Sequence, residues 1–172
     1  MRIAVSGTHG VGKSTLIDEF LRRHPEYVHE PEPYTIMVED LQEEFSEEPC
    51  VEDFLRQLDF NIDRLTQHSV NENVIYERCP VDFLAYIHAL DPQTAATMRE
   101  SVYEAMKHLD LILYLPLEEA SDEFPKLQRA VDRKLSSIYQ EDEIANVVEA
   151  DGPTAQRLRI LENSINIKHT SL

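Results

Sequence analysis

Two hydrophobic patterns alternate along the 172-residue chain. Short runs of consecutive apolar residues, such as residues 3–5, end at glycine, proline or charged residues and are typical of buried strands. These runs predict strands at residues 2–6, 27–30, 73–76, 109–115 and 146–149. Between them, apolar residues recur every three or four positions, as at Phe54, Leu58, Ile62 and Leu65, which is the spacing of an amphipathic helix. This pattern predicts helices at 13–24, 34–45, 51–68, 81–90, 95–107, 123–139 and 154–167.

The order of these elements predicts an α/β fold. Strands that alternate with helices form a parallel sheet through right-handed crossovers, with helices on both faces. The segment LDLILYL, residues 109–115, is nearly all apolar, as expected for a central strand that is covered on both sides. The chain shows no internal repeat and no low-complexity linker, so we expect residues 1–172 to form one domain with about five strands.

Composition and charge narrow the classes of function. The formal net charge of −17 argues against nucleic acid as a partner, because a polyanion would be repelled. No segment approaches the roughly 20 apolar residues of a membrane span, and the apolar N-terminal stretch is too short for a secretory signal. Cys50 and Cys79 show no metal-binding or disulfide pattern, and the histidines form no metal-ligand spacing. We therefore expect a cytoplasmic protein with reduced thiols, and the sequence leaves open whether it forms a homodimer.

Acidic residues are concentrated in one segment. Residues 39–53 contain eight carboxylates and no basic residue. Such a segment is either a solvated helix and loop or a surface that selects a cationic substrate or partner, and the sequence does not decide between these readings.

Three of the four glycines lie within six residues of each other, in the segment GTHGVGKST. This segment fits the pattern G-x-x-x-x-G-K-[ST], with a predicted strand before it and a predicted helix after it. Glycines allow a tight loop whose backbone N–H groups surround phosphates, and the helix N-terminus adds further donors. We call residues 7–15 the phosphate loop. The predicted nucleotide-binding residues are Gly7, Thr8, His9, Gly10, Val11, Gly12, Lys13, Ser14 and Thr15.

Two side chains of this loop have predicted roles in binding ATP and Mg²⁺. Lys13 supplies a cation for the β- and γ-phosphates, and the Ser14 hydroxyl is a candidate ligand of Mg²⁺. The chain has no N-K-x-D stretch for reading guanine and no LSGGQ-like signature of transport ATPases, whereas a small-molecule kinase fits a domain of this size.

The end of the third predicted strand carries an acid followed by an arginine. Glu77 is a candidate to orient Mg²⁺, and Arg78 is a candidate to neutralise charge on the phosphates; the alternative is an ordinary ion pair at a strand end. The segment ERCPVDFLAY resembles the Asp/Glu-Arg-Ser or Asp-Arg-Tyr segment of deoxynucleoside and thymidylate kinases and of related small ATPases that include ribosylnicotinamide kinases. Cys79 departs from the serine or tyrosine of that pattern. The resemblance implies a three-layer P-loop NTPase fold with a helical lid at about residues 120–142.

The segment YVHEPEPY adds to this resemblance. In deoxynucleoside kinases a Glu-Pro pair follows the second strand, and its glutamate takes the proton of the acceptor hydroxyl. Both Glu30-Pro31 and Glu32-Pro33 resemble this pair, and Glu30 is preferred because it directly ends the strand. The alternative is a proline-rich turn with exposed acids.

Residues 122–139 resemble the lid of these kinases. On a helix, Lys126, Arg129 and Arg133 share one face, opposite a face of apolar residues. The resemblance implies that Arg129 and Arg133 close over the transferring phosphoryl group, and the alternative is a solvated helix face. In the same kinases a glutamine and an arginine at the spacing of Gln57 and Arg64 face the nucleobase, although these two residues also suit the polar side of an amphipathic helix.

Together these features predict a kinase that transfers the γ-phosphoryl group of ATP to a nucleoside-like or nucleotide-like small molecule. Its predicted catalytic residues are Lys13, Glu30, Glu77, Arg78, Arg129 and Arg133, and its predicted metal ligands are Ser14 and Glu77. The alternatives are a regulatory ATPase that signals to a protein partner, for which residues 39–53 would be a contact surface, and a phosphate-loop fold without catalytic activity.

Overall fold

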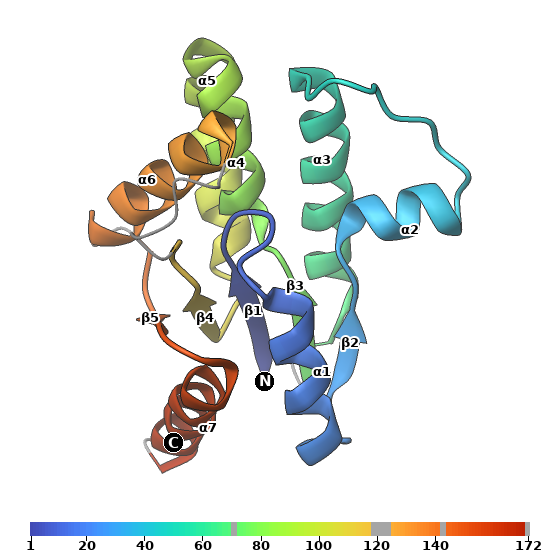
Figure 1. Ribbon diagram of the computed structural model, residues 1–172. Coiled ribbons are helices and arrows are strands. Elements are labelled where there is room, and N and C mark those ends of the chain that lie inside the picture. The colour runs from blue at the N-terminus through green and yellow to red at the C-terminus, as the bar shows by residue number, and fades with distance from the viewer. Residues whose placement is uncertain (70–71, 118–124, 142–143, 171–172) are drawn as a thin grey trace.

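The computed structural model describes residues 1–69, 72–117, 125–141 and 144–170 (Figure 1). The strands are β1 (Arg2–Ser6), β2 (Val28–Glu30), β3 (Val74–Glu77), β4 (Leu111–Tyr114) and β5 (Val147–Glu149). The helices are α1 (Lys13–Arg23), α2 (Pro33–Glu39), α3 (Val51–Gln67), α4 (Pro80–Leu90), α5 (Pro92–Met106), α6 (Lys126–Gln140) and α7 (Thr154–Thr170).

The strands form one parallel sheet in the order β2-β3-β1-β4-β5. In the register of this sheet, Val5 lies beside Glu77 and Ser6 lies beside Tyr114. The carboxyl ends of β1, β3 and β4 therefore meet at one edge, which is where open α/β sheets bind their ligands. The five-stranded parallel sheet that the sequence predicts is confirmed.

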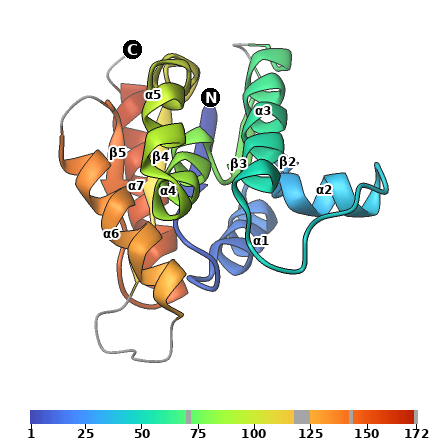
Figure 2. The same cartoon turned by 90° about the horizontal axis from the view of Figure 1, so that it is seen from above.

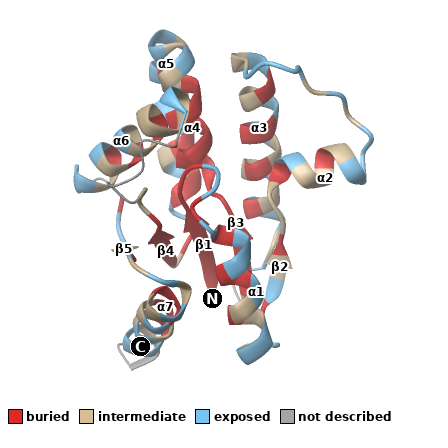
Figure 3. Ribbon diagram, in the orientation of Figure 1, coloured by how far each residue is buried: buried red, intermediate tan, exposed pale blue. Residues whose placement is uncertain are grey.

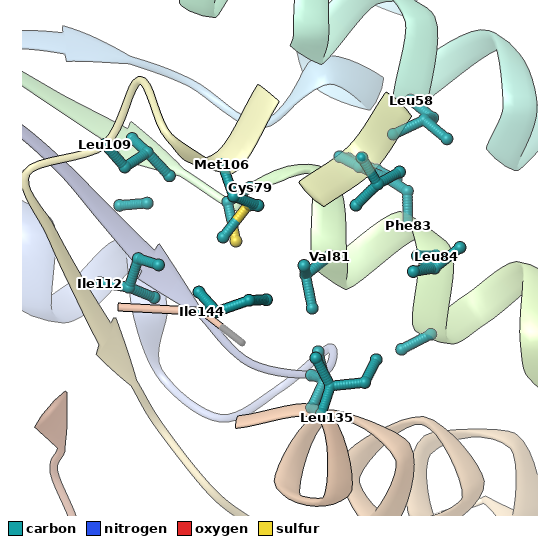
Figure 4. Close-up of a cluster of buried hydrophobic side chains, with 14 of the residues drawn as sticks. Leu58, Cys79, Val81, Phe83, Leu84, Met106, Leu109, Ile112, Leu135 and Ile144 are labelled. Atoms are coloured by element: carbon teal, nitrogen blue, oxygen red, sulfur yellow. The ribbon is translucent and has the colours of Figure 1, made fainter. Parts of the chain in front are cut away.

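Helices cover both faces of the sheet, and two hydrophobic clusters fill the space between the layers (Figures 1 and 2). On β1, Ala4 packs into the cluster under α3, α4, α5 and α6, whereas Ile3 and Val5 pack into the cluster under α1 and α7. This alternation follows from the two-residue repeat of a strand. Figure 3 shows that the central strands are buried, and Figure 4 shows Cys79, Val81 and Leu135 within the larger cluster.

Several helix boundaries differ from the sequence prediction, and the differences at α2 and α5 have a local cause. The helix expected at residues 34–45 ends at Glu39, and Gln42 beyond it has φ +56°. Four carboxylates between residues 39 and 44 repel one another, which disfavours continuation of the helix. The helix expected at 95–107 begins at Pro92, because the Asp91 carboxylate accepts the N–H of Gln93 as an N-cap and proline suits the first helical position.

Within the part of the chain that the structure describes, no helix is long and apolar enough to cross a membrane.

Candidate active site

The phosphate loop joins β1 to α1 in a conformation that requires glycine at two positions. Gly7 has φ +146°, and a Cβ atom there would lie 2.6 Å from the carbonyl oxygen of Leu115. Gly12 has φ +90° and directly precedes α1. Residues with a side chain rarely adopt such φ angles, so these glycines let the backbone turn tightly before the helix. The loop therefore has the shape that its sequence predicts.

A buried carboxylate from α4 holds the start of the loop. Oδ1 of Asp82 accepts hydrogen bonds from the Ser6 hydroxyl (3.0 Å) and the Gly7 N–H (2.8 Å), while Oδ2 accepts the Cys79 N–H (2.9 Å). The Tyr139 hydroxyl of α6 donates to Ser6 Oγ (2.7 Å), and burial raises the pKa of this tyrosine well above its usual value. Because Asp82 is fully buried, the hydrogen bonds that it accepts lie in a medium of low polarity, and this surrounding strengthens each hydrogen bond.

Tyr86 of α4 connects the loop to a second region of the site. Its hydroxyl lies 3.1 Å from Thr8 Oγ1 and accepts the His9 N–H at 3.0 Å. Its ring stacks on Phe54 of α3, with the ring centroids 4.6 Å apart. One side chain thus contacts both the phosphate loop and the helix that faces it across the site.

Lys13 is buried at the start of α1, with only 4% of its surface exposed. Its Nζ donates to the carbonyl oxygen of Thr8 (2.9 Å). Burial and the nearby charge of Arg78 lower the pKa of Lys13 from 10.5 to about 8. A buried cation with a depressed pKa is stabilised when an anion binds next to it, so Lys13 is placed to attract the phosphates of a nucleotide.

Ser14 and Glu77 form a pair of oxygen ligands beside the loop. The Ser14 hydroxyl donates to Glu77 Oε1 (2.7 Å), and Glu77 is itself 7% exposed at the end of β3. Hydroxyl and carboxylate oxygens suit Mg²⁺, which binds proteins through one or two such ligands and keeps several waters. The described residues contain no group of three or more His, Cys, Asp or Glu side chains that could hold a metal ion by themselves. Ser14 and Glu77 therefore fit a Mg²⁺ ion that would take further ligands from a nucleotide.

Arg78 follows Glu77 with φ +76°, an unfavourable angle for a residue with a side chain. Its N–H donates to the Val5 carbonyl (3.0 Å), its Nε to Glu32 Oε1 (2.6 Å) and its Nη1 to the Gly7 carbonyl (3.2 Å). Burial alone would raise the pKa of Glu32, but the charges of Arg78 and Lys13 outweigh it and hold that pKa below its usual value. The strained backbone thus directs a charged guanidinium between the loop and the Glu32 carboxylate.

Two cavities meet at Glu32. The smaller cavity, of about 240 Å³, is lined by His9, Gly10, Gly12, Lys13, Ser14, Glu32 and Glu77. The larger cavity, of about 620 Å³, has an aromatic wall formed by Tyr34, Phe45, Phe54, Phe83 and Tyr86. Gln57 and Arg78 also line it. Glu32 and His9 line both cavities, so the site consists of a polar compartment at the phosphate loop and an apolar compartment beside it.

A family model described as an AAA domain matches residues 2–157 of the chain. The chain belongs to this AAA domain family. A comparison with curated protein sequences gives no significant match.

Solved structures of kinases share the fold of this AAA domain. Deoxyadenosine kinase from M. mycoides, with dCMP and dCDP bound, has a TM-score of 0.69 and 17% identity, over 96% of this chain and 99% of the kinase. Thymidylate kinase from Ehrlichia chaffeensis has a TM-score of 0.64 and 15% identity, over 95% and 97%. NadR in complex with NR has a TM-score of 0.67 and 15% identity over 96% of this chain, which spans only 50% of the NadR chain. These likenesses confirm the three-layer P-loop fold and the predicted resemblance to nucleoside and nucleotide kinases.

The structure places the two Glu-Pro pairs of the AAA domain differently. Glu30, which the sequence favoured as the acceptor-binding carboxylate, forms an ion pair with Arg64, and its Oε1 lies 2.7 Å from His68 Nε2. It lines neither of the two cavities, whereas Glu32 lines both. The structure thus separates the two carboxylates, because Arg64 and His68 engage Glu30 and the chain turns into α2 at Glu32, and a catalytic role of Glu30 stays a prediction.

Gln57 and Arg64, which the sequence grouped together, also separate. Gln57 is 5% exposed and lines the larger cavity. Arg64 pairs with Glu30 and lines a different cavity between α2 and α3. Only the glutamine is thus available to a ligand in the larger cavity.

The helix expected to form the lid packs against α4 through the predicted apolar face, which includes Val131, Leu135 and Ile138. Arg133 is exposed, and neither Arg129 nor Arg133 is among the described residues that line the two cavities. Gln128 lines the larger cavity instead and donates from Nε2 to the His9 carbonyl (2.9 Å). The predicted lid residues 120–124 and 142 lie outside the described residues.

Several residues of the site were missed by the sequence analysis. They are Asp82, Tyr86, Gln128 and Arg157, whose Nη1 donates to the Val11 carbonyl (2.6 Å). The sequence does contain a pattern that points to Asp82 and Tyr86. These polar residues are four positions apart, so they lie on one face of a helix that begins directly after Glu77 and Arg78. No sequence pattern points to Gln128 or Arg157, because they reach the phosphate loop from remote segments of the chain.

Proposed function

We propose that this AAA domain is a phosphotransferase that moves the γ-phosphoryl group of ATP to a nucleoside-like or nucleotide-like small molecule. The observation that carries the proposal is the position of Glu32 at the junction of the two cavities. A protein that only binds or hydrolyses a nucleotide has no need of an apolar compartment of about 620 Å³ beside its phosphate loop. A volume of this size suits a small organic ligand.

The phosphate loop is the proposed site of ATP. Its backbone N–H groups and Lys13 hold the phosphates, and Ser14 and Glu77 hold Mg²⁺, which supplies charge neutralisation on the phosphate oxygens when bound. Asp82 and Tyr86 keep the loop in the shape that this binding requires. Their role is positioning, since each of them contacts the loop backbone.

The larger cavity is the proposed acceptor site. Its aromatic wall suits a flat ring, and the Gln57 amide offers hydrogen bonds to polar atoms of such a ring. Glu32 orients the acceptor group towards the phosphate loop, and Arg78 stabilises negative charge that develops on the transferring phosphoryl group. Neither Arg129 nor Arg133 is among the described residues that line the two cavities, so their catalytic role stays a prediction, as do the cytoplasmic location and a homodimer.

The two Glu-Pro pairs allow a matched test of the proposal. Glu32→Gln should lower kcat by about 100-fold with a small change in the KM for ATP, because it removes acceptor positioning and leaves the phosphate loop intact. Glu30→Gln should keep kcat within about threefold. The measurement is acceptor-dependent release of ADP with a panel of nucleosides, nucleoside monophosphates and ribosylnicotinamide. Equal losses in the two variants, or a loss only in Glu30→Gln, would contradict the assignment.

A second measurement separates the kinase from a regulatory ATPase. Slow ADP release that no acceptor accelerates, and that a protein partner alters, would favour the regulatory ATPase. Lys13→Ala should abolish ATP turnover in either case. Turnover at the parent rate in this variant would refute both functions.

A further inference from the structure

The larger cavity has an unusual balance of charge for a site next to a phosphate loop. Among the described residues that line it, Arg78 is the only lysine or arginine, whereas Glu32, Glu47 and Asp53 are all carboxylates. Lys126, Arg129 and Arg133 of α6 are not among the described lining residues.

Arg78, the one lysine or arginine among the described lining residues, already has partners. Arg78 is 3% exposed, donates to Glu32 and to the Gly7 carbonyl, and has its guanidinium 5.4 Å from the centre of the Tyr86 ring. Burial lowers the pKa of Arg78, but the charge of Glu32 outweighs this effect and raises it. A phosphate group on the acceptor would have to compete with Glu32 and the Gly7 carbonyl for Arg78, and loss of the pair with Glu32 would leave a buried carboxylate without its partner, which is costly.

The two other carboxylates that line the cavity, Asp53 and Glu47, differ in their surroundings. Asp53 accepts hydrogen bonds from Arg56 Nη2 (2.6 Å) and the Ser46 N–H (2.8 Å), and these bonds outweigh burial and lower its pKa to about 2. Glu47 is exposed at the mouth of the cavity. Because Arg56 balances the charge of Asp53, Glu47 is the lining carboxylate that disfavours a dianionic phosphate and favours a positively charged ring.

The apolar surfaces of the cavity describe the rest of the ligand. Phe54 and Tyr86 stack nearly parallel, with an interplanar angle of 16°, and Tyr34 and Phe45 form a second aromatic pair at 5.0 Å. Gln57 is a single buried amide among them. This lining suits a flat heteroaromatic ring that is neutral or positively charged.

We propose that the acceptor is an unphosphorylated nucleoside-like compound, with a hydroxyl group as the acceptor and a neutral or cationic ring, rather than a nucleoside monophosphate. This inference rests on the proposed function. Arg78 binds Oε1 of Glu32, so Oε2 is the oxygen that can accept a proton. In the transfer step the O–H bond of the acceptor breaks and its proton passes to Glu32. The acceptor oxygen forms a bond to the γ-phosphorus, and the bond from the γ-phosphorus to the bridging oxygen breaks, so its electron pair leaves with ADP.

The first experiment compares each nucleoside with its own 5′-monophosphate. ADP release is measured with adenosine, cytidine, thymidine and ribosylnicotinamide and with the matching monophosphates. We expect kcat/KM for the best nucleoside to exceed that for its monophosphate at least 100-fold. Turnover with monophosphates alone would overturn this inference and leave the proposed kinase function standing. If no compound of either series accelerated ADP release, the kinase function itself would fall, and the inference with it.

The second experiment tests whether charge causes the preference. Glu47→Lys reverses a charge at the mouth of the cavity, and Glu48→Lys makes the same change at the adjacent exposed residue, which is not among the described lining residues. From screened Coulomb interactions, Glu47→Lys should reduce the nucleoside-to-monophosphate ratio of kcat/KM by about threefold to tenfold at low salt. Glu48→Lys should change it less than twofold. The same ratio in the parent and in Glu47→Lys would overturn the charge argument.

Discussion

Replacing Lys13 with methionine should stabilise the nucleotide-free protein while it removes ATP binding. The ammonium group of Lys13 is almost fully buried, and its pKa is lowered from 10.5 to about 8. A difference of this size corresponds to about 3 kcal/mol that the folded protein spends to keep Lys13 charged at neutral pH. Methionine has a similar length and no charge, so this cost disappears.

Part of the gain is offset by a lost hydrogen bond. Lys13 Nζ donates to the Thr8 carbonyl, and removal of this donor costs about 1 kcal/mol. The expected net effect is an increase of about 2 kcal/mol in the free energy of unfolding at pH 7. For a domain of this size, that corresponds to a rise of about 4–8 °C in Tm.

The stability difference between Lys13→Met and the parent protein should also depend on pH. The pKa of Lys13 is lower in the folded than in the unfolded protein, so the destabilisation is fully present below about pH 8. It disappears as the pH rises towards 10.5, because the unfolded chain then also loses the proton. The stability difference between Lys13→Met and the parent should therefore shrink between pH 7 and pH 10.

The assay is urea unfolding of the nucleotide-free proteins at pH 7, 8.5 and 10. Lys126→Met, at an exposed lysine of α6, is the control and should change the free energy of unfolding by less than about 0.5 kcal/mol. A Lys13→Met protein that is less stable than the parent at pH 7, or whose stability difference does not vary with pH, would refute the reasoning.

Three further predictions concern the loop. Tyr86→Phe removes the hydroxyl that holds Thr8 and should raise the KM for ATP about tenfold in steady-state assays; an unchanged KM would contradict the positioning role. Gly7→Ala places a Cβ atom 2.6 Å from the Leu115 carbonyl at a positive φ and should lower stability by at least about 2 kcal/mol in thermal unfolding, whereas a neutral change would argue against this loop geometry. ATP binding favours charged Lys13, so the apparent Kd for ATP, measured by calorimetry, should rise above about pH 8 by up to tenfold per pH unit; a constant Kd from pH 7 to 9.5 would show that Lys13 does not bind the phosphates in this way.

The predicted elements and the phosphate loop depend on local patterns, and this is why they were readable from the sequence. The apolar run at residues 109–115 specifies a strand that is buried on both faces, and the spacing of Gly7, Gly12 and Lys13 specifies a loop that surrounds phosphates. Each pattern involves residues within one turn or one strand. The boundary errors at α2 and α5 arose where local charge repulsion and an N-cap changed the ends of a helix by a few residues.

The choice between Glu30 and Glu32 could only be made in three dimensions. The two residues have the same local pattern, and each becomes distinct through a partner far along the chain, Arg64 for Glu30 and Arg78 for Glu32. Which partner each one meets depends on how α2 and α3 pack beside the sheet, and no short segment of sequence encodes that packing.

Tertiary packing also decides which side chains of α6 contact the phosphate loop. Its apolar face was predicted from its own sequence and is confirmed. Its position on α4 decides that Gln128 reaches the His9 carbonyl of the phosphate loop. One residue along a helix changes the direction of a side chain by about 100°, so a contact with a remote loop depends on the placement of the whole helix. The sequence alone thus determined the order of strands and helices along the chain and the nucleotide-binding loop, and tertiary packing decided which side chains complete the site.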